Sequence, residues 1–369
     1  MAPAPSRTGF LDRIRVALTA LVILHHAAIM FGAPGGWYLT IPTNNLAEKL
    51  PFAVFVSVNQ AFFMGFFFLL AGYFSAMSYE RKGAARFARD RLLRLGIPLL
   101  VYGFVLGPLT VAVAGVHEGE PFLAHWASLS ARGYFNIGPL WFALALLIFS
   151  AAYLLWRQLR GTVGLQNWSP SHRTLLLAAL ATGAGAFLLR LFMPTGQDIW
   201  GLQIGYFASY TVLFAGGCAM AGSRWLDAIG PEQARRWRLV AWIVGPLLFV
   251  YGIVASLVLG QPFDTSGGWT LPALAYAFWE PFVAWGIILG MLARFRRQDN
   301  PSPRWQAWAA PAYAAYILHP PLLTAIGLAV ATLPLPNMAK FVIAGVTGVA
   351  ASFLAARLLI KLPGAKAIL

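Results

Sequence analysis

Long windows without a charged residue recur along this chain of 369 residues. Each window approaches the ~20 residues that an α-helix needs to cross a lipid bilayer, or reaches that length together with its neighbour across one polar residue. We predict an all-α polytopic membrane protein with ten transmembrane helices, in a single membrane domain over residues 1–369. The expected spans are roughly 11–32, 51–78, 94–115, 138–157, 174–193, 203–222, 239–260, 271–293, 308–331 and 338–360.

The composition excludes a soluble globular domain. Charged residues make up 11% of the chain and hydrophobic residues 59%, whereas about a quarter of the residues of a soluble domain are charged. The first apolar stretch has the layout of a secretory signal, but nine more predicted spans follow it. We therefore expect an uncleaved first helix rather than a signal that is removed.

The basic residues fall almost entirely on one side of the predicted spans. The segments on the other side hold only four of the 27 Lys and Arg residues, namely Lys49, Arg132, Arg190 and Lys340. Because Lys and Arg concentrate in cytoplasmic loops, both termini are expected in the cytoplasm. The net charge of +15 then reflects membrane orientation, so membrane lipids are the expected partners and nucleic acid is not.

Two histidines interrupt the first apolar stretch. Within residues 16–31 only His25 and His26 can ionise, and Arg15 marks the entrance to the stretch. Eleven helical steps from Arg15 to His26 return to nearly the same face and rise ~16 Å. His26 should then lie near the middle of the bilayer, where ionisable residues usually face a cavity or a substrate path. His25 points roughly 100° away, which favours a packing role.

Two more polar residues are expected at the same depth. Glu280 lies in the eighth predicted span and His319 in the ninth, each about halfway along. Pro320 and Pro321 should bend the second of these helices and free backbone carbonyls. We predict one chamber that these two residues share with His26, in which Glu280 orients an imidazole. A His–Glu pair that only joins two helices is the alternative.

The sequence offers no basis for a metal site or a permanently bound cofactor. Two histidines and one glutamate on three helices lack any local zinc motif. The single Cys218 permits no internal disulfide and provides no thiol cluster. We expect it to be a small buried apolar residue.

Motifs along the chain resemble the acyltransferase-3 family of integral membrane proteins. Asp12, Arg15 and His26 stand at the spacing that this family shows in its opening helix. The later matches are the run 66–73, a basic segment with Phe87, Arg91, Leu92, Arg94, Leu95 and Pro98, the run 138–142, and the run 313–320. Within the family, the runs 35–38 and 279–282 are similar to the group that succinylates periplasmic glucans.

The resemblance implies a multi-pass acyltransferase of the bacterial inner membrane. Its donor substrate would be an acyl-coenzyme A made in the cytoplasm, and its acceptor a hydroxyl of an extracytoplasmic glycan. The acyl group would be succinyl or acetyl. A neutral imidazole suits this chemistry, because its unperturbed pKa of about 6.5 lets it take a proton from an attacking hydroxyl. We expect His26 to be the general base, and Arg15 to bind donor phosphate or fix the local geometry. We expect His319 to assist at the oxyanion or the leaving thiol. A covalent acyl-His26 intermediate stays open.

A basic segment is the candidate site for the nucleotide head of the donor. Residues 81–94 contain six cations and one acid. Arg91 and Arg94 are three apart and so are neighbours on a helix. With Arg89 they would bind the anionic head of coenzyme A. Attachment to anionic lipid headgroups is the alternative.

Aromatic residues on the opposite side are candidates for acceptor binding. Trp37, Tyr38, Trp141 and Trp269 offer flat faces of the kind that sugar rings pack against. Trp and Tyr also form belts at membrane interfaces, which is the alternative for each of them.

Another class of function also fits the sequence. In a proton-coupled secondary transporter or flippase, the mid-membrane histidines and glutamate would form a proton relay. A catalytically inactive scaffold of a glucan-synthesis complex is a third hypothesis. The acyl group, the acceptor glycan, and assembly as a homo-oligomer or with glucan-synthesis partners all stay open.

Overall fold

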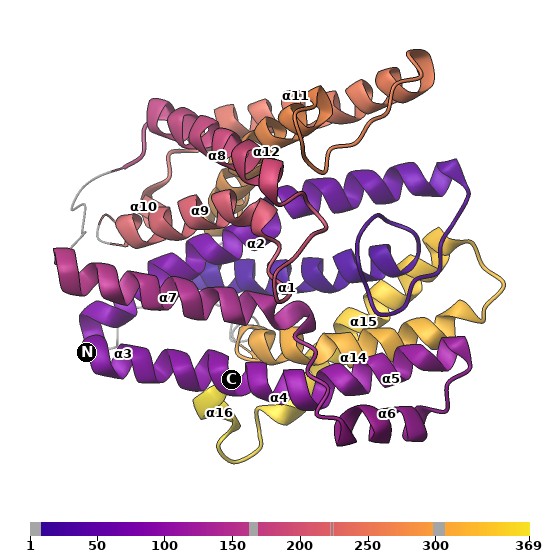
Figure 1. Ribbon diagram of the computed structural model, residues 1–369. Helices are drawn as coiled ribbons and strands as arrows, with labels where there is room; N and C mark the ends of the chain where they lie inside the picture. Colours follow the sequence, from indigo (N-terminus) through magenta and orange to yellow (C-terminus); the bar gives the residue numbers. More distant parts are fainter. Residues whose placement is uncertain (1–8, 162–168, 222, 224, 298–306) are drawn as a thin grey trace. The chain divides into compact units, whose positions relative to one another are not determined.

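The computed structural model describes residues 9–161, 169–221, 223, 225–297 and 307–369. The regular elements within these ranges are helices (Figure 1). The β-pairing found there is one isolated bridge between Ile199 and Leu202. The helices are α1 (Gly9–Met30), α2 (Leu46–Lys82), α3 (Ala84–Arg91), α4 (Ile97–Val101), α5 (Gly107–Gly115), α6 (Phe122–Ala131), α7 (Trp141–Arg160), α8 (His172–Phe192), α9 (Phe207–Met220), α10 (Trp225–Ala228), α11 (Pro231–Ile253), α12 (Leu271–Arg297), α14 (Ala312–Ala331), α15 (Asn337–Leu359) and α16 (Ala365–Ile368). The predicted all-α class is confirmed.

The helices also confirm a multi-pass membrane protein. In the part of the chain that the structure describes, nine helical runs are long and apolar enough to span a bilayer. A shorter apolar run, Ile204–Met220, coincides with the remaining predicted span, 203–222. The sequence did not predict α6, which occupies the expected loop between the third and fourth spans. The side of the membrane on which the termini lie stays a prediction.

Two of the four cations assigned to the sparsely charged side are not surface residues. Arg190 is 1% exposed, and Lys340 is 9% exposed and donates from Nζ to the carbonyl of Ala331. Lys49 and Arg132 are exposed. Two exposed cations thus remain of the four that the sequence assigned to that side.

The third span departs from regular α-helix at two places. A π-helical turn at Leu92–Gly96 precedes Pro98, and a second at Tyr102–Leu106 precedes Pro108. A proline cannot donate to the carbonyl four residues before it, so the helix widens locally where that bond is missing. Such turns are frequent at functional sites.

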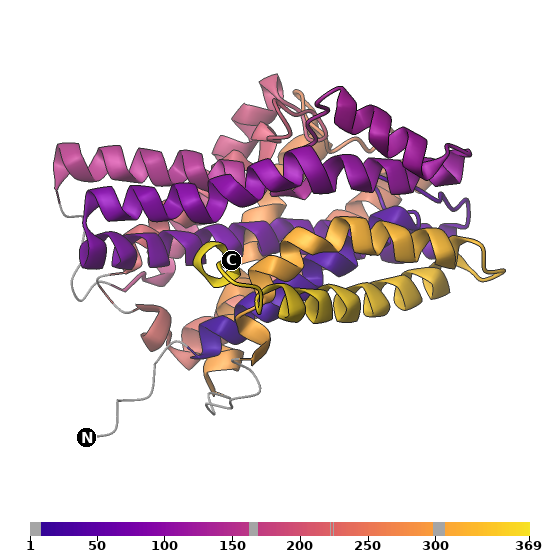
Figure 2. The same ribbon diagram turned by 90° about the horizontal axis from the view of Figure 1, so that it is seen from below.

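The chain divides into two compact units, and each is built from three separate stretches. The first comprises residues 1–14, 58–88 and 149–301, and the second comprises residues 15–57, 89–148 and 302–369. The single domain over residues 1–369 stays a prediction. Within the second unit, α14 and α15 lie side by side in both views (Figures 1 and 2).

Small residues let helices of the second unit approach closely. A Cβ on Gly348 of α15 would lie 2.8 Å from a methyl carbon of Leu323 on α14. Ile23 and Ala27 of α1 and Leu323 are buried in one apolar cluster with Ala344 of α15. Association of helices in lipid depends on such close packing. This packing fixes the positions of α1 and α14, which carry His26 and His319.

Candidate active site

His26 of α1 and His319 of α14 are in direct contact. His26 Nδ1 lies 3.0 Å from His319 Nε2. The ring planes differ by 5° and the ring centroids are 5.1 Å apart. Since the nitrogen contact is much shorter than the centroid separation, the two imidazoles lie edge to edge in nearly one plane. His319 is 0% exposed and His26 is partly buried. The structure thus brings together two of the residues that the sequence predicted to share a chamber.

The hydrogen bonds of this pair determine where the protons reside. His319 Nδ1 lies 2.5 Å from the carbonyl oxygen of Tyr316. A carbonyl can only accept, so His319 Nδ1 donates, and in a neutral ring Nε2 then carries the lone pair. His26 Nδ1 must donate to that lone pair. The remaining nitrogen, His26 Nε2, is the basic atom at the end of a chain of two hydrogen bonds.

Trp37 covers one face of the histidine pair. Its ring lies 4.1 Å from the His26 ring with an interplanar angle of 19°, and 5.8 Å from the His319 ring. The sequence predicted Trp37 as a platform for the acceptor, but one of its faces packs on the imidazole. Its Nε1 is buried, with no hydrogen-bond partner among the described residues. A substrate must therefore reach His26 from a side that Trp37 does not cover.

The segment that carries Trp37 is tied down by Asn337 at the start of α15. Asn337 Nδ2 donates to the carbonyls of Phe31, at 3.0 Å, and Ile41, at 2.9 Å. The N–H of Ile41 also donates to the carbonyl of Met30, at 2.7 Å. These bonds close residues 31–41 into a loop against the end of α1. Trp37 is therefore held over His26 by a fixed loop.

Tyr38 belongs to a buried polar cluster beside this loop. Its hydroxyl donates to Asn136 Oδ1 at 2.7 Å and lies 3.0 Å from the hydroxyl of Tyr102. Tyr102 is fully buried in the second π-helical turn. Burial raises the pKa of the Tyr38 phenol above its ordinary value, so this group stays a neutral donor. A Cβ on Gly138, where φ is +44°, would collide with the Tyr38 hydroxyl.

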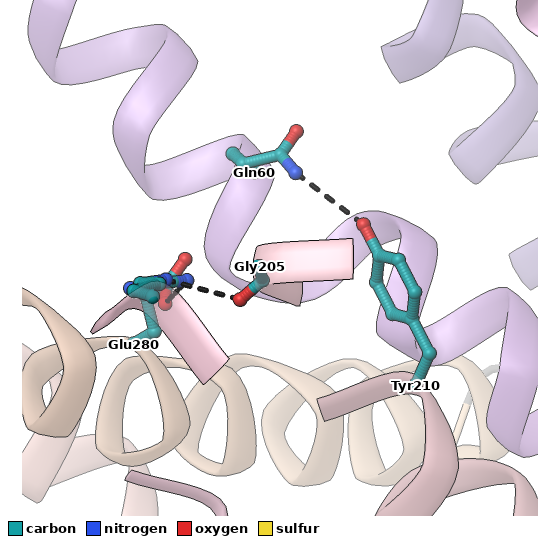
Figure 3. A network of polar contacts seen from close by, with 5 residues as sticks. Gln60, Gly205, Tyr210 and Glu280 are labelled. Atoms are coloured by element: carbon teal, nitrogen blue, oxygen red, sulfur yellow. Dashed lines mark hydrogen bonds and ion pairs between the residues drawn. The ribbon is translucent and has the colours of Figure 1, made fainter. Parts of the chain in front are cut away.

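Glu280 has a different partner from the imidazole that we predicted. It lies in the first unit, where Arg190 Nη2 donates to its Oε2 at 2.5 Å. Arg190 Nε also donates to the carbonyl of Gly205 at 3.0 Å (Figure 3). The guanidinium carbon lies 5.1 Å from the Tyr206 ring and 5.0 Å from the Tyr276 ring. The sequence analysis counted Arg190 among the exterior cations and therefore missed this pair.

The other predicted site residues are spread over both units. Arg15, Arg89, Arg91, Arg94 and Trp141 lie in the second unit, where Arg89 and Arg94 are exposed and the other three partly buried. Trp269 lies in the first unit, is 82% exposed, and makes an edge contact with Phe187. Within the described ranges, no group of three or more His, Cys, Asp or Glu residues is arranged to hold a metal ion.

The sequence reasoning assigned no role to Tyr316, which contacts His319 directly. Its carbonyl accepts from His319, and its hydroxyl donates to the carbonyl of Pro139. A signal for the first contact was present, because Pro320 has no N–H to offer to the carbonyl four residues before it. The sequence predicted freed carbonyls near His319 without assigning a partner to either of them.

Comparison with known proteins identifies what the chain is similar to. A family model described as an acyltransferase domain matches residues 8–357. A glucans biosynthesis protein C of Salmonella gallinarum (strain 287/91 / NCTC 13346) is 30% identical over 178 residues, which are 46% of this chain and 42% of that protein. The protein of the same name from Salmonella schwarzengrund (strain CVM19633) is 33% identical over 153 residues, or 40% and 38% of the two chains. The match thus spans about two fifths of each curated relative, and no solved structure matches.

Proposed function

This chain belongs to the acyltransferase-3 family, and on that premise we propose that it acylates a glycan across a membrane. The donor is a coenzyme A thioester from the cytoplasm, the acceptor is a hydroxyl of an extracytoplasmic glycan, and the acyl group is succinyl or acetyl. The name of the Salmonella relatives supports an acceptor related to glucan synthesis. A bacterial inner membrane is the location that fits a cytoplasmic donor and an external acceptor.

The observation that carries this proposal is the polarised histidine pair. His26 Nε2 takes the proton of the acceptor hydroxyl while the hydroxyl oxygen forms a bond to the thioester carbonyl carbon. The carbon–sulfur bond then breaks, and coenzyme A leaves as a thiol with the proton that His26 held. The products are a glycan ester and free coenzyme A, and the histidine pair returns to its starting state.

His319 assists by stabilising the charge that forms on His26. When His26 Nε2 is protonated, its Nδ1–H still points at the lone pair of His319 Nε2, 3.0 Å away. An ionised donor strengthens a hydrogen bond, so this contact tightens as the reaction proceeds. The sequence analysis expected His319 at the oxyanion or the leaving thiol. The geometry instead supports a role on the far side of His26 from the reacting hydroxyl.

The remaining predicted residues bind the two substrates in this proposal. Arg15, Arg89, Arg91 and Arg94 bind the anionic head of the donor, which the exposure of Arg89 and Arg94 supports. Trp37, Tyr38 and Trp141, which lie in the second unit, bind the acceptor, and Tyr38 is already engaged by Asn136. Trp269 of the first unit, which is 82% exposed, stays a separate prediction.

The test is transfer by purified protein in proteoliposomes that contain the donor on one side and glucan on the other. His26→Ala is expected to abolish release of coenzyme A and acylation of the glucan, while His25→Gln, on the adjacent buried position, serves as the matched control. Normal transfer by His26→Ala would contradict the proposed base. If the wild type releases no coenzyme A but takes up a solute, the result would support a transporter instead.

A further inference from the structure

Pro320 follows His319 directly inside α14. In an α-helix, the N–H of each residue donates to the carbonyl four residues before it. Proline has no N–H, so the carbonyl of Tyr316 lacks this regular donor. The structure shows the replacement, because His319 Nδ1 lies 2.5 Å from that same oxygen.

We propose that Pro320 is a positioning residue that sets the protonation pattern of the catalytic histidine pair. By leaving the Tyr316 carbonyl free, it keeps the proton of His319 on Nδ1. His319 Nε2 then carries a lone pair, which draws the proton of His26 onto its Nδ1. The basic lone pair is thereby kept on His26 Nε2, where the acceptor hydroxyl must arrive. The catalytic part of this inference rests on the proposed function, whereas the protonation pattern does not.

The opposite protonation pattern conflicts with the geometry. A proton on His319 Nε2 would leave a lone pair on Nδ1 facing the Tyr316 carbonyl oxygen across 2.5 Å. If His26 were protonated on Nδ1, two N–H groups would then face each other across the contact. If His26 accepted at Nδ1 instead, its lone pair would lie on the side of His319, and its Nε2 would be protonated and could not act as the base. A carbonyl and two imidazoles in series therefore favour one direction for both hydrogen bonds.

The accepting carbonyl is held in place by the side chain of its own residue. The Tyr316 hydroxyl donates to the carbonyl of Pro139, and its ring makes an edge contact with Phe142 at 6.1 Å. The same ring lies 5.7 Å from the ring of His319. The hydroxyl and the ring of Tyr316 are thus both held by contacts, and its carbonyl stays directed at His319.

Pro321 provides a matched control in the same helix. It removes the regular donor of the Ile317 carbonyl, which lies about 100° further round the helix than that of Tyr316. The His319 side chain is bonded to the Tyr316 carbonyl. A change at Pro321 therefore alters the local helix in a similar way without returning an N–H to the oxygen that His319 uses.

The experiment compares full-length wild type, Pro320→Ala and Pro321→Ala in lipid nanodiscs. Nitrogen-15 labelling of the histidine rings distinguishes an Nδ1–H from an Nε2–H imidazole by NMR, and His26→Gln and His319→Gln variants assign the signals. The wild type and Pro321→Ala are expected to show Nδ1–H for both rings. In Pro320→Ala the restored N–H competes for the Tyr316 carbonyl, and a second population of His319 with Nε2–H is expected.

Acyl transfer by the same three proteins provides the second readout. Pro320→Ala is expected to lower kcat in proportion to the population with an Nε2–H His319, with little change in KM for the donor, because the base is misdirected in those molecules. Nε2–H imidazoles in the wild type would overturn the proposal, as would a Pro320→Ala protein identical to Pro321→Ala in both readouts. If no acyl transfer occurs, the proposed function fails while the NMR result still decides the protonation pattern. If Pro320→Ala does not fold, Nε2–H imidazoles in the wild-type spectrum would still overturn the proposal.

Discussion

His26 Nδ1 and His319 Nε2 lie 3.0 Å apart although 293 positions separate the two residues in the sequence. The contact joins the C-terminal part of α1 to the middle of α14, and it lies in a part of the unit where the neighbouring side chains are apolar or aromatic. A hydrogen bond in such surroundings is stronger than the same bond in water. The pair is therefore suited to share a proton during catalysis.

The histidine pair should act as a unit. His319→Gln is expected to lower kcat on the order of 10²-fold, because His26 loses the lone pair that orients and stabilises it. The measurement is the rate of coenzyme A release by the two single variants and by His26→Ala/His319→Gln. The double variant should be no slower than His26→Ala alone. Multiplicative losses would show that the two histidines act independently.

Trp37 should matter for its ring rather than for any single polar atom. Trp37→Ala removes the cover at 4.1 Å from the His26 ring and is expected to reduce kcat on the order of 10²-fold through misplacement of the base. Trp37→Phe retains an aromatic face and should keep more of the activity. Equal losses in both variants would instead point to the buried indole N–H.

The pair of Arg190 and Glu280 is expected to stabilise the first unit. Glu280→Gln or Arg190→Met leaves one buried charge without its partner, which costs about 3–5 kcal/mol of unfolding free energy. The double variant should be less destabilised than the two losses combined, as measured by thermal unfolding in detergent. A Glu280→Gln protein with normal stability and slow acyl transfer would restore the catalytic role that the sequence predicted.

The crossing of α2 and α9 should depend on a glycine. A Cβ on Gly217 would collide with the backbone carbonyl oxygen of Leu69, which cannot move aside. Gly217→Ala is expected to cost about 1–3 kcal/mol of unfolding free energy. On Gly216 the nearest atom to a new Cβ is the flexible end of Met220, at 3.2 Å. Gly216→Ala is the control, and similar losses in both variants would contradict this packing.

Tyr38 should stabilise the second unit through its hydroxyl. Tyr38→Phe leaves Asn136 Oδ1 without its donor, which is expected to cost about 1–3 kcal/mol. Tyr134→Phe is the control, because its hydroxyl contact with Asn136 is 3.4 Å and the residue is 40% exposed.

The same hydroxyl predicts a pH dependence. Burial raises the pKa of Tyr38 above its value in the unfolded chain, which is about 10. The contribution of the Tyr38 hydroxyl to the free energy of unfolding is therefore complete below pH ~10. It declines above that pH, because the unfolded chain loses the proton first. Unfolding curves of wild type and Tyr38→Phe should therefore converge in alkali. A constant difference between them would contradict the raised pKa.

Much of the fold was predictable because lipid imposes a simple requirement on the sequence. Every backbone polar group in the bilayer must be bonded within its own segment, so each apolar window has to be a helix. The predicted span 271–293 and α12 (Leu271–Arg297) show how closely the window and the helix agree. The short helix α6 was missed because it lies in a connecting segment, where this requirement does not apply.

The site was predictable only in part. The common helix face of Arg15 and His26 follows from the spacing of residues along one helix, and so does the loss of a donor at the Tyr316 carbonyl. The placement of Trp37 over His26 depends on bonds from Asn337, which is far away in the sequence. The partner of Glu280 depends on how α8 packs against α12. The spacing of residues within one helix contains no information about the placement of Trp37 or the partner of Glu280.

The sequence by itself determined the apolar helices, their lengths and the presence of His26, Glu280 and His319 within them, because these depend on the solvent around each segment. Only the tertiary structure decided which of those residues meet: His26 with His319 in one unit, and Glu280 with Arg190 in the other. Contacts between helices are set by the shapes of whole faces and by small residues such as Gly348. Such complementarity between distant segments arises only when the helices pack.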